Sequence, residues 1–261
     1  MRDARCGYVE AALTDTRIQL CGRIMVELDG RRVEPDIPGR QGRLLFVYLA
    51  LHRARAVGRD EIAAAIWPEQ APPGARATLR TILSRLRRAL GAGVLDGRDQ
   101  LRLVLPGDSF VDIEVAAAKI HEAEAAVHAE DWPRALAAAT IAYTISRRGF
   151  LAGEDAPWVL EQRQCLEDTH LRALECDGVA SLGIGGSEVA AAERDARRLV
   201  RLAPYRESGY RLLMRALQRR GDGAEALLVY EQLRTVLRDE LGATPSPLSQ
   251  ALHRHLLRDT D

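Results

Sequence analysis

The sequence predicts a mainly α-helical fold with small antiparallel β-sheets, divided into two domains. The chain has 261 residues, and a domain commonly has about 100–200. Residues 15–110 combine short β patterns with three helical patterns, whereas residues 111–261 carry helical patterns almost without a break. Apolar residues make up 47% and charged residues 28% of the chain, a composition typical of chains that fold around a packed core. We therefore expect one domain at residues 15–110 and an all-α domain at residues 111–261.

The first domain is predicted to begin with a β-hairpin followed by two helices. Apolar and polar residues alternate over residues 17–34, and Asp29-Gly30 within them is a strong hairpin-turn signal. Residues 40–52 place leucine, valine and tyrosine at helical spacing. A second helical pattern at residues 58–67 has acidic residues in its first turn, where the helix dipole favours them.

A third helix and a second hairpin complete this domain. Residues 68–74 contain three prolines and a glycine, which exclude a helix there. Residues 75–90 form the best-defined helical pattern of the domain and end at Gly91, as helices commonly do. Two short β patterns within residues 94–105 flank a polar turn and predict a hairpin. A helix, a loop, a helix and a hairpin in this order are the plan of a winged helix-turn-helix.

The second domain is predicted to be a tetratricopeptide-like helical-repeat domain. A motif seen as Glu130–Leu136 returns as Gly221–Leu227, and Gly186–Ala192 is a weaker copy. The copies that start at residues 186 and 221 are 35 residues apart, close to the ~34-residue period of helical hairpins. Those that start at residues 130 and 186 are 56 apart, so we expect an array with an insertion. Each such hairpin buries its apolar face only against its neighbours. An irregular alanine-rich bundle is the alternative.

Positive charge is concentrated in the first part of the chain. The whole chain has 37 basic and 37 acidic residues. Residues 1–110 hold 18 arginines and 13 acidic residues, a net charge of +5, which leaves 19 basic and 24 acidic residues, or −5, for the remainder. A charge of +5 is common on proteins that never bind DNA. The arrangement of the arginines within the third helix is therefore more informative.

The helix at residues 76–90 has two distinct faces. Its four leucines lie in one stripe, which we expect to face the core. The opposite face has small residues at its centre and arginines on its flanks, and the helix contains no acidic residue. Short side chains permit close approach to a major groove ~12 Å wide, and arginines reach phosphates or guanine edges. The candidate DNA-binding residues are Arg76, Thr78, Arg80, Thr81, Ser84, Arg85, Arg87 and Arg88 on this helix and Arg98 and Arg102 on the second hairpin. The alternative is the solvated face of an ordinary amphipathic helix.

Longer stretches resemble the SARP-type antibiotic regulatory proteins, which join an OmpR-type winged helix to a bacterial transcriptional activation domain. Val57–Gly91 is similar to that family's second helix, loop and recognition helix. Gly149–Trp158 resembles the mid-domain loop of the activation domain, and Tyr230–Leu252 resembles its closing signature. The resemblance covers roughly residues 17–257. In one departure, residues 99–101 read Asp-Gln-Leu where the OmpR-type wing commonly ends in Gly-Tyr, so an aromatic contribution is absent there.

The resemblance implies a sequence-specific transcriptional activator that controls a biosynthetic gene cluster. The positions that face bases in the family are Thr78, Thr81 and Arg85, and those near the DNA backbone are Arg76, Arg87 and Arg88. Family members typically bind direct repeats in double-stranded DNA as homodimers. They recruit RNA polymerase holoenzyme through the activation domain and the loop between the two helices, which here carries Glu69 and Gln70. Larger relatives append ATPase or sensor domains, and we expect the small stand-alone form here.

The sequence predicts no catalytic site, no cofactor and no metal. Its four cysteines form no CxxC pair, and no arrangement of Ser, His and Asp or of Cys and His stands out. A secretory leader and an apolar stretch of membrane-spanning length are absent, so we expect a cytoplasmic, nucleoid-associated protein without a membrane partner. Two alternatives stay open: a helical scaffold or signalling adaptor whose winged helix mediates protein contacts, and, more remotely, an enzyme with a site built from dispersed residues.

Overall fold

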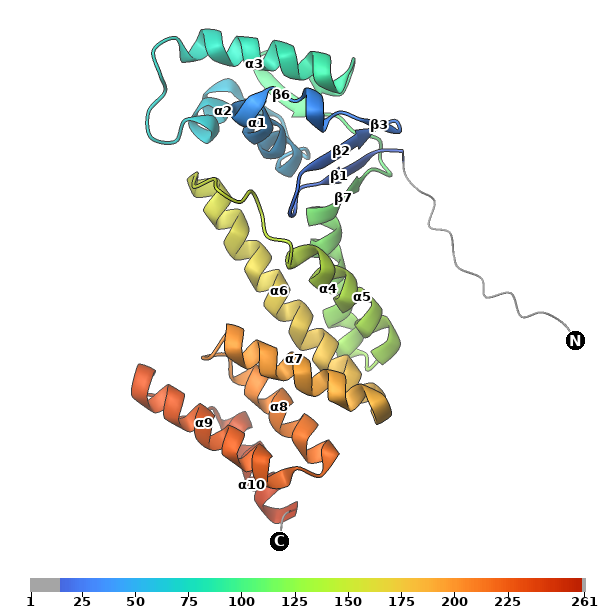
Figure 1. Ribbon diagram of the computed structural model, residues 1–261, viewed down its shortest axis with the longest axis vertical. Coiled ribbons are helices and arrows are strands. Elements are labelled where there is room, and N and C mark those ends of the chain that lie inside the picture. The colour runs from blue at the N-terminus through green and yellow to red at the C-terminus, as the bar shows by residue number, and fades with distance from the viewer. Residues whose placement is uncertain (1–14, 260–261) are drawn as a thin grey trace, which may run out of the picture. The chain divides into compact units, whose positions relative to one another are not determined.

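The computed structural model describes residues 15–259, which form two compact units (Figure 1). Unit 1 comprises residues 15–112 together with Phe150–Gln162, and unit 2 comprises Ile113–Gly149 together with residues 163–259. The expected mainly helical fold with small antiparallel sheets is confirmed. Over residues 15–259, no helix is both long and apolar enough to cross a membrane.

The first sheet of unit 1 forms around the predicted hairpin. Strand β1 (Arg17–Gln19) pairs antiparallel with β2 (Met25–Leu28), and β2 pairs antiparallel with β3 (Arg31–Arg32). The turn between β2 and β3 has positive φ at Asp29 and Gly30, 50° and 72°, as a tight hairpin turn of the primed type requires. Strand β7 (Phe110–Val111) lies parallel to β1 on its other side. Local patterns did not predict this pairing, because its strands are far apart in the chain.

Three helices follow β3 in the chain, and each begins and ends within one residue of its predicted range. They are α1 (Gly39–Leu51), α2 (Arg59–Ile66) and α3 (Ala75–Leu90), with a short 3₁₀ turn, η1 (Glu34–Asp36), before α1. Helix α1 packs against both α2 and α3, and its central residues are fully buried. It is therefore the core helix on which the other two rest.

The second sheet contains the predicted second hairpin. Strands β5 (Leu95–Asp96) and β6 (Gln100–Leu103) pair antiparallel, which confirms the hairpin. Strand β4 (Val57–Gly58), between α1 and α2, pairs with the other edge of β6. This third strand was not predicted, and it joins the hairpin to the residue that precedes α2.

A segment distant in sequence also belongs to unit 1. We call this segment, Phe150–Gln162, the strap. Phe150 forms an isolated β-bridge with Cys21, and both are buried. The Asp112 carboxylate, at the start of α4 (Asp112–His128), accepts hydrogen bonds from the backbone N–H groups of Leu20 and Cys21 at 2.8 and 3.0 Å. A domain boundary between residues 110 and 111 stays a prediction, while by contacts the strap groups with the residues before it.

Unit 2 consists of helices that pack on one another in chain order (Figure 1). Helix α8 packs between α7 and α9, and α10 packs on α8 and α9. A core centred on Tyr210, Met214 and Leu233 joins these four, while alanines dominate the core that α4, α5 and α6 share. The three copies of the repeated motif lie where α5, α7 and α9 begin, as expected for tetratricopeptide-like hairpins. The further elements are α5 (Trp132–Ser146), α6 (Pro157–Ile184), η2 (Gly186–Glu188), α7 (Val189–Leu202), α8 (Glu207–Arg220), α9 (Gly223–Leu241) and α10 (Pro247–Asp259).

Candidate nucleic-acid interface

Glycines fix both ends of α3. Gly74 precedes the helix with φ of 80° and Gly91 follows it with φ of 92°, backbone conformations that favour glycine. The Gly74 carbonyl accepts hydrogen bonds from the N–H groups of Ala77 and Thr78 at 2.9 and 3.0 Å. At the other end, Gly91 donates to the Arg87 carbonyl at 3.0 Å. The two glycines and these hydrogen bonds therefore define where the helix begins and ends.

One face of α3 is buried as predicted. Leu79, Leu83, Leu86 and Leu90 are only 5, 1, 0 and 3% exposed. These leucines lie on the side of the helix that packs against α1. Burial of four leucines stabilises the position of the helix by several kcal/mol, so its outward face is rigid.

The outward face contains most of the predicted DNA-binding residues. The Thr81 hydroxyl donates to the Ala77 carbonyl at 3.1 Å and so lies close to the helix backbone. Ala77, Thr81 and Ser84 are all short, so no long side chain projects from the centre of this face. The exposed candidates on α3 are Arg76, Thr78, Arg80, Thr81, Ser84, Arg85 and Arg88.

Four arginines on this face are open to an external acceptor. Within residues 15–259, the guanidinium groups of Arg76, Arg80, Arg85 and Arg88 form no ion pair or hydrogen bond, and we call these four the open arginines. Arg85 and Arg88 line a surface hollow of about 410 Å³ that also contains Asp36. The Asp36 carboxylate, however, pairs with Arg31 at 3.4 Å.

Arg87 differs from the open arginines because it contacts the protein itself. It is half-buried, and its guanidinium donates to the carbonyl of Gly97 in the turn between β5 and β6. Gly97 has φ of 89°, and a Cβ atom there would lie 1.8 Å from the Gln100 carbonyl oxygen, so only glycine fits this turn. Arg87 thus fastens the hairpin to α3, a contact that its place in the sequence did not reveal.

The two predicted hairpin residues are placed differently from each other. Arg98 is exposed, and its carbonyl accepts a hydrogen bond from Nε of Arg59 at 2.6 Å. Arg102 is also exposed, but its Nε donates to the Arg53 carbonyl at 3.2 Å. The Arg98 side chain therefore projects from the turn, while the Arg102 side chain contacts the end of the α1 region.

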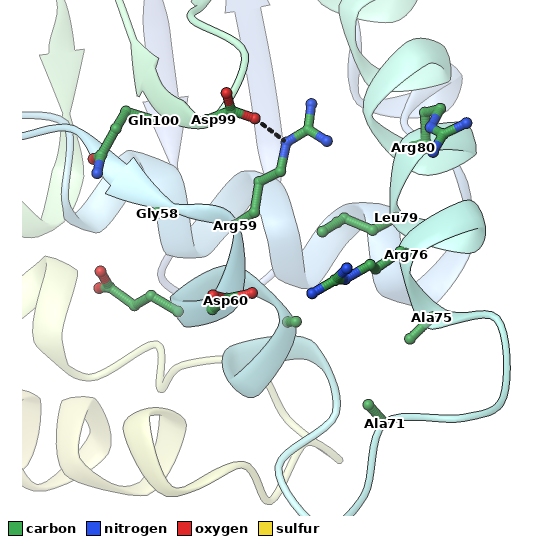
Figure 2. A pocket seen from close by; sticks show the side chains of 12 residues that line it. Gly58, Arg59, Asp60, Ala71, Ala75, Arg76, Leu79, Arg80, Asp99 and Gln100 are labelled. Atoms are coloured by element: carbon green, nitrogen blue, oxygen red, sulfur yellow. Dashed lines mark ion pairs between the residues drawn. The ribbon is translucent and has the colours of Figure 1, made fainter.

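A hollow of about 680 Å³ lies where the starts of α2 and α3 face the hairpin turn (Figure 2). Figure 2 shows Arg59 reaching from the start of α2 toward Asp99, with which it pairs at 3.7 Å, and Arg76 pointing from α3 toward α2. Glu61 also lines the hollow, but the Arg55 guanidinium lowers the pKa of its carboxyl group to about 2 and holds it as a charged partner. Asp60 lines the hollow too, but within residues 15–259 neither Arg76 nor Arg80 forms an ion pair with it.

Sequence reasoning missed the part that Arg59 takes in this hollow. Gly58 precedes a helix with acidic residues in its first turn. This signal predicts where α2 begins, but it does not predict which residues of the hairpin contact the start of α2. The pairing of β4 with β6 brings Arg59 to the turn, and its backbone N–H donates to the Asp99 carbonyl at 3.2 Å. Only this long-range strand pairing identifies Arg59.

The loop between α2 and α3 is exposed around its predicted contact residues. Glu69 and Gln70 are both exposed. The end of the loop is ordered by a hydrogen bond from the Ala75 N–H to the Pro72 carbonyl at 3.0 Å. The loop therefore presents a carboxylate and an amide beside the helix with the open arginines.

Similarity to known proteins assigns the chain to a family. A family model of the bacterial transcriptional activator domain matches residues 111–257. The chain belongs to this family of transcriptional regulators. A second model, of the C-terminal domain of transcriptional regulatory proteins, matches residues 38–101. The first region runs from α4 into α10 and the second from α1 past β5. Together with the relatives AfsR and DnrI, these matches confirm the resemblance to SARP-type regulators.

Three relatives show the extent of the similarity. The regulatory protein AfsR of Streptomyces coelicolor is 34% identical over 93% of this chain, and the regulatory protein DnrI of Streptomyces peucetius is 27% identical over 93% of it. The solved structure of Mycobacterium tuberculosis EmbR in complex with a low affinity phosphopeptide matches with a TM-score of 0.83 at 26% identity, over 94% of this chain and 65% of that one. The chain spans 24% of AfsR and 92% of DnrI.

Proposed function

We propose that the protein is a sequence-specific DNA-binding transcriptional activator that docks α3 in the major groove. The observation that carries this proposal is the outward face of α3, where the open arginines flank small side chains on a helix without acidic residues. A groove ~12 Å wide accepts such a helix, because the low centre permits close approach while the flanks reach phosphates. Membership in a family of transcriptional regulators supports it.

Within this proposal the side chains of α3 divide into two groups. Thr78, Thr81 and Arg85 contact base edges, because they lie on the outward face where the helix enters the groove deepest. Arg76, Arg80 and Arg88 neutralise phosphates. Ser84 adds a short hydroxyl at the centre of the face.

The hairpin contributes in two ways. Arg98 reaches the DNA backbone from the turn, because its side chain is exposed next to Gly97. Arg87 and Arg102 act through the position of the hairpin, since their guanidiniums donate to the carbonyls of Gly97 and Arg53. Arg59 also positions the turn, because its Nε donates to the Arg98 carbonyl.

The finer parts of the proposal concern partners. Two copies of the chain bind direct repeats near a promoter, and Glu69 and Gln70 of the exposed loop contact RNA polymerase holoenzyme. The target is a biosynthetic gene cluster, and the protein works in the cytoplasm at the nucleoid. The exposure of the loop beside α3 supports the polymerase contact, and the similarity to AfsR and DnrI supports a regulatory role.

A footprint over the DNA that flanks the protein's own gene tests the proposal. We expect purified protein to protect two repeated elements beside a promoter at low salt. A variant with Arg76, Arg80, Arg85 and Arg88 all changed to alanine should lose this protection while it keeps its thermal midpoint, because these side chains are exposed. Arg219→Ala, an exposed position on α8, is the control and should protect normally. If the unmodified protein binds no flanking DNA even at low salt, the proposal fails, and a protein-binding role of the winged helix becomes the better account.

A further inference from the structure

The strap supplies the end of α2 with a hydrogen bond that α2 cannot make for itself. The last carbonyl groups of a helix have no partner within it. Here the chain cannot continue the helix to supply one, because Pro68 follows two residues after Ile66 and has no N–H. The Trp158 indole N–H, which comes from the strap, donates to the Ala65 carbonyl in the last turn of α2 at 3.0 Å.

Aromatic contacts hold the Trp158 ring in place. It lies edge-on to Tyr48 of α1, with ring centroids 5.2 Å apart, and to Phe150 of the strap, at 6.2 Å. The Tyr48 hydroxyl in turn donates to Oε1 of Glu61 in α2 at 2.8 Å. Trp158 is thus packed between the two helices that it joins.

The strap is also fastened at its other end and in its middle. Phe150 bridges to Cys21, and Nε of Arg40 in the first turn of α1 donates to Oε1 of Glu154 at 2.9 Å. Between these points the backbone of Leu151 has φ of 41°, a conformation that costs a non-glycine residue free energy and persists only where the surroundings impose it. The strap is therefore fixed by contacts rather than by its own preference.

We propose that Trp158 is a positioning residue whose indole N–H caps α2 and so fixes where the loop of residues 68–74 leaves that helix. The other end of this loop is fixed independently, by the Gly74 carbonyl at the start of α3. Loss of the cap thus displaces Glu69 and Gln70 but leaves α3 in place. For its consequence this inference rests on the proposed function: activation of transcription should need Trp158, and DNA binding should not.

Trp158→Phe in the full chain tests this inference, because phenylalanine keeps an aromatic ring between α1 and α2 but has no N–H. The Trp67 amide donates to Ala63 in the same turn, so its hydrogen exchange reports fraying of the helix end. We expect exchange about fivefold faster, the ratio that corresponds to loss of one hydrogen bond. DNA affinity should stay within about twofold, and transcription from the footprinted promoter should fall.

Trp132→Phe is the matched control. Trp132 begins α5 in unit 2, where its ring packs against Gly183, and within residues 15–259 its indole N–H makes no hydrogen bond. This variant should leave both the exchange at Trp67 and the transcription unchanged.

Each outcome decides a different point. Unchanged exchange at Trp67 in Trp158→Phe overturns the cap, and faster exchange with full transcription overturns its role in activation. If the unmodified protein activates no transcription, the proposed function fails, while the exchange measurement still decides the cap. If the phenylalanine variant does not fold, the indole N–H resonance of Trp158 in the unmodified protein decides instead: slow exchange with solvent supports the cap, and exchange as fast as that of Trp132 overturns it.

Discussion

Arg85 and Arg88 form a matched pair that tests the proposed division between base and phosphate contacts. Both are open arginines one turn apart on α3, and both line the same surface hollow. Alanine at either position removes one positive charge from the same surface and favours the helix. Any difference between the two variants therefore reports what each guanidinium contacts in the complex.

The expected losses differ in kind as well as in size. Each neutralised phosphate contributes about 0.9 to the slope of log affinity against log salt concentration. Arg88→Ala should therefore lower the slope by about 0.9 on every DNA sequence, so that from 50 to 200 mM salt the unmodified protein loses about 3.5-fold more affinity than the variant. Arg85→Ala should cost about 1–3 kcal/mol, roughly 5- to 150-fold, on the cognate site. On unrelated DNA its effect should be small.

Fluorescence anisotropy titrations provide the measurement. Each variant is titrated against the footprinted fragment and a scrambled duplex of the same length at several salt concentrations, with Arg219→Ala as the control for loss of an exposed charge on unit 2. Equal losses for Arg85→Ala on both duplexes would refute its assignment to a base. A loss for Arg219→Ala as large as that for either α3 variant would refute the placement of the contact on α3.

Three further predictions concern the stability of the fold, two at the hairpin beside α3 and one in unit 2. Arg87→Ala should lower the thermal midpoint by about 2–4 °C, because it removes a hydrogen bond worth about 1 kcal/mol between α3 and the hairpin; an unchanged midpoint in a melting scan would contradict this. Gly97→Ala should cost about 2 kcal/mol or more in the free energy of unfolding, because its Cβ meets the Gln100 carbonyl at positive φ; full stability by urea titration would show that the turn can relax. Burial, together with the neighbouring Asp177 carboxylate, raises the pKa of Asp195 to about 7. The Asp195 carboxyl group therefore keeps its proton in the folded state up to about pH 7, whereas in the unfolded state it loses this proton near pH 4. As the pH rises from about 4 to 7, the free energy of unfolding should therefore fall. Asp177→Asn should remove the repulsion and raise the free energy of unfolding at pH 8 by about 1–2 kcal/mol, since solvent screens part of the effect, and equal urea midpoints at pH 8 would count against it.

Local patterns predicted the elements of unit 1 that are stabilised locally. The helices α1, α2 and α3 and the hairpin of β5 and β6 depend on apolar spacing, turn residues and helix ends, all of which lie within a few residues of one another. The leucine face of α3 was predicted for the same reason, because a 100° rotation per residue fixes which side chains share a face.

Long-range contacts set the rest, and the sequence carried only weak signals for them. Strand β7 pairs with β1, β4 pairs with β6, and the strap packs on α1 and α2, each across a large separation in the chain. The sequence groups Arg87 with the predicted DNA-binding arginines because its side chain lies on the flank of the helix, and that assignment stays a prediction. Its acceptor is a backbone carbonyl in a glycine turn, and residue types alone do not identify such a partner.

The pairing of arginines explains how a chain of zero net charge can present the proposed DNA-binding surface. In unit 2, arginines pair with carboxylates of neighbouring helices: Arg172 of α6 pairs with Glu124 of α4 at 2.6 Å, and Arg197 of α7 pairs with Glu225 of α9 at 2.6 Å. Helix α3 contains no acidic residue, and among residues 15–259 no carboxylate forms an ion pair with an open arginine. A phosphate backbone responds to the charge within about a Debye length, roughly 8–10 Å, rather than to the total over the molecule. The net charge of zero therefore does not count against DNA binding, because none of the acidic residues among residues 15–259 pairs with an open arginine.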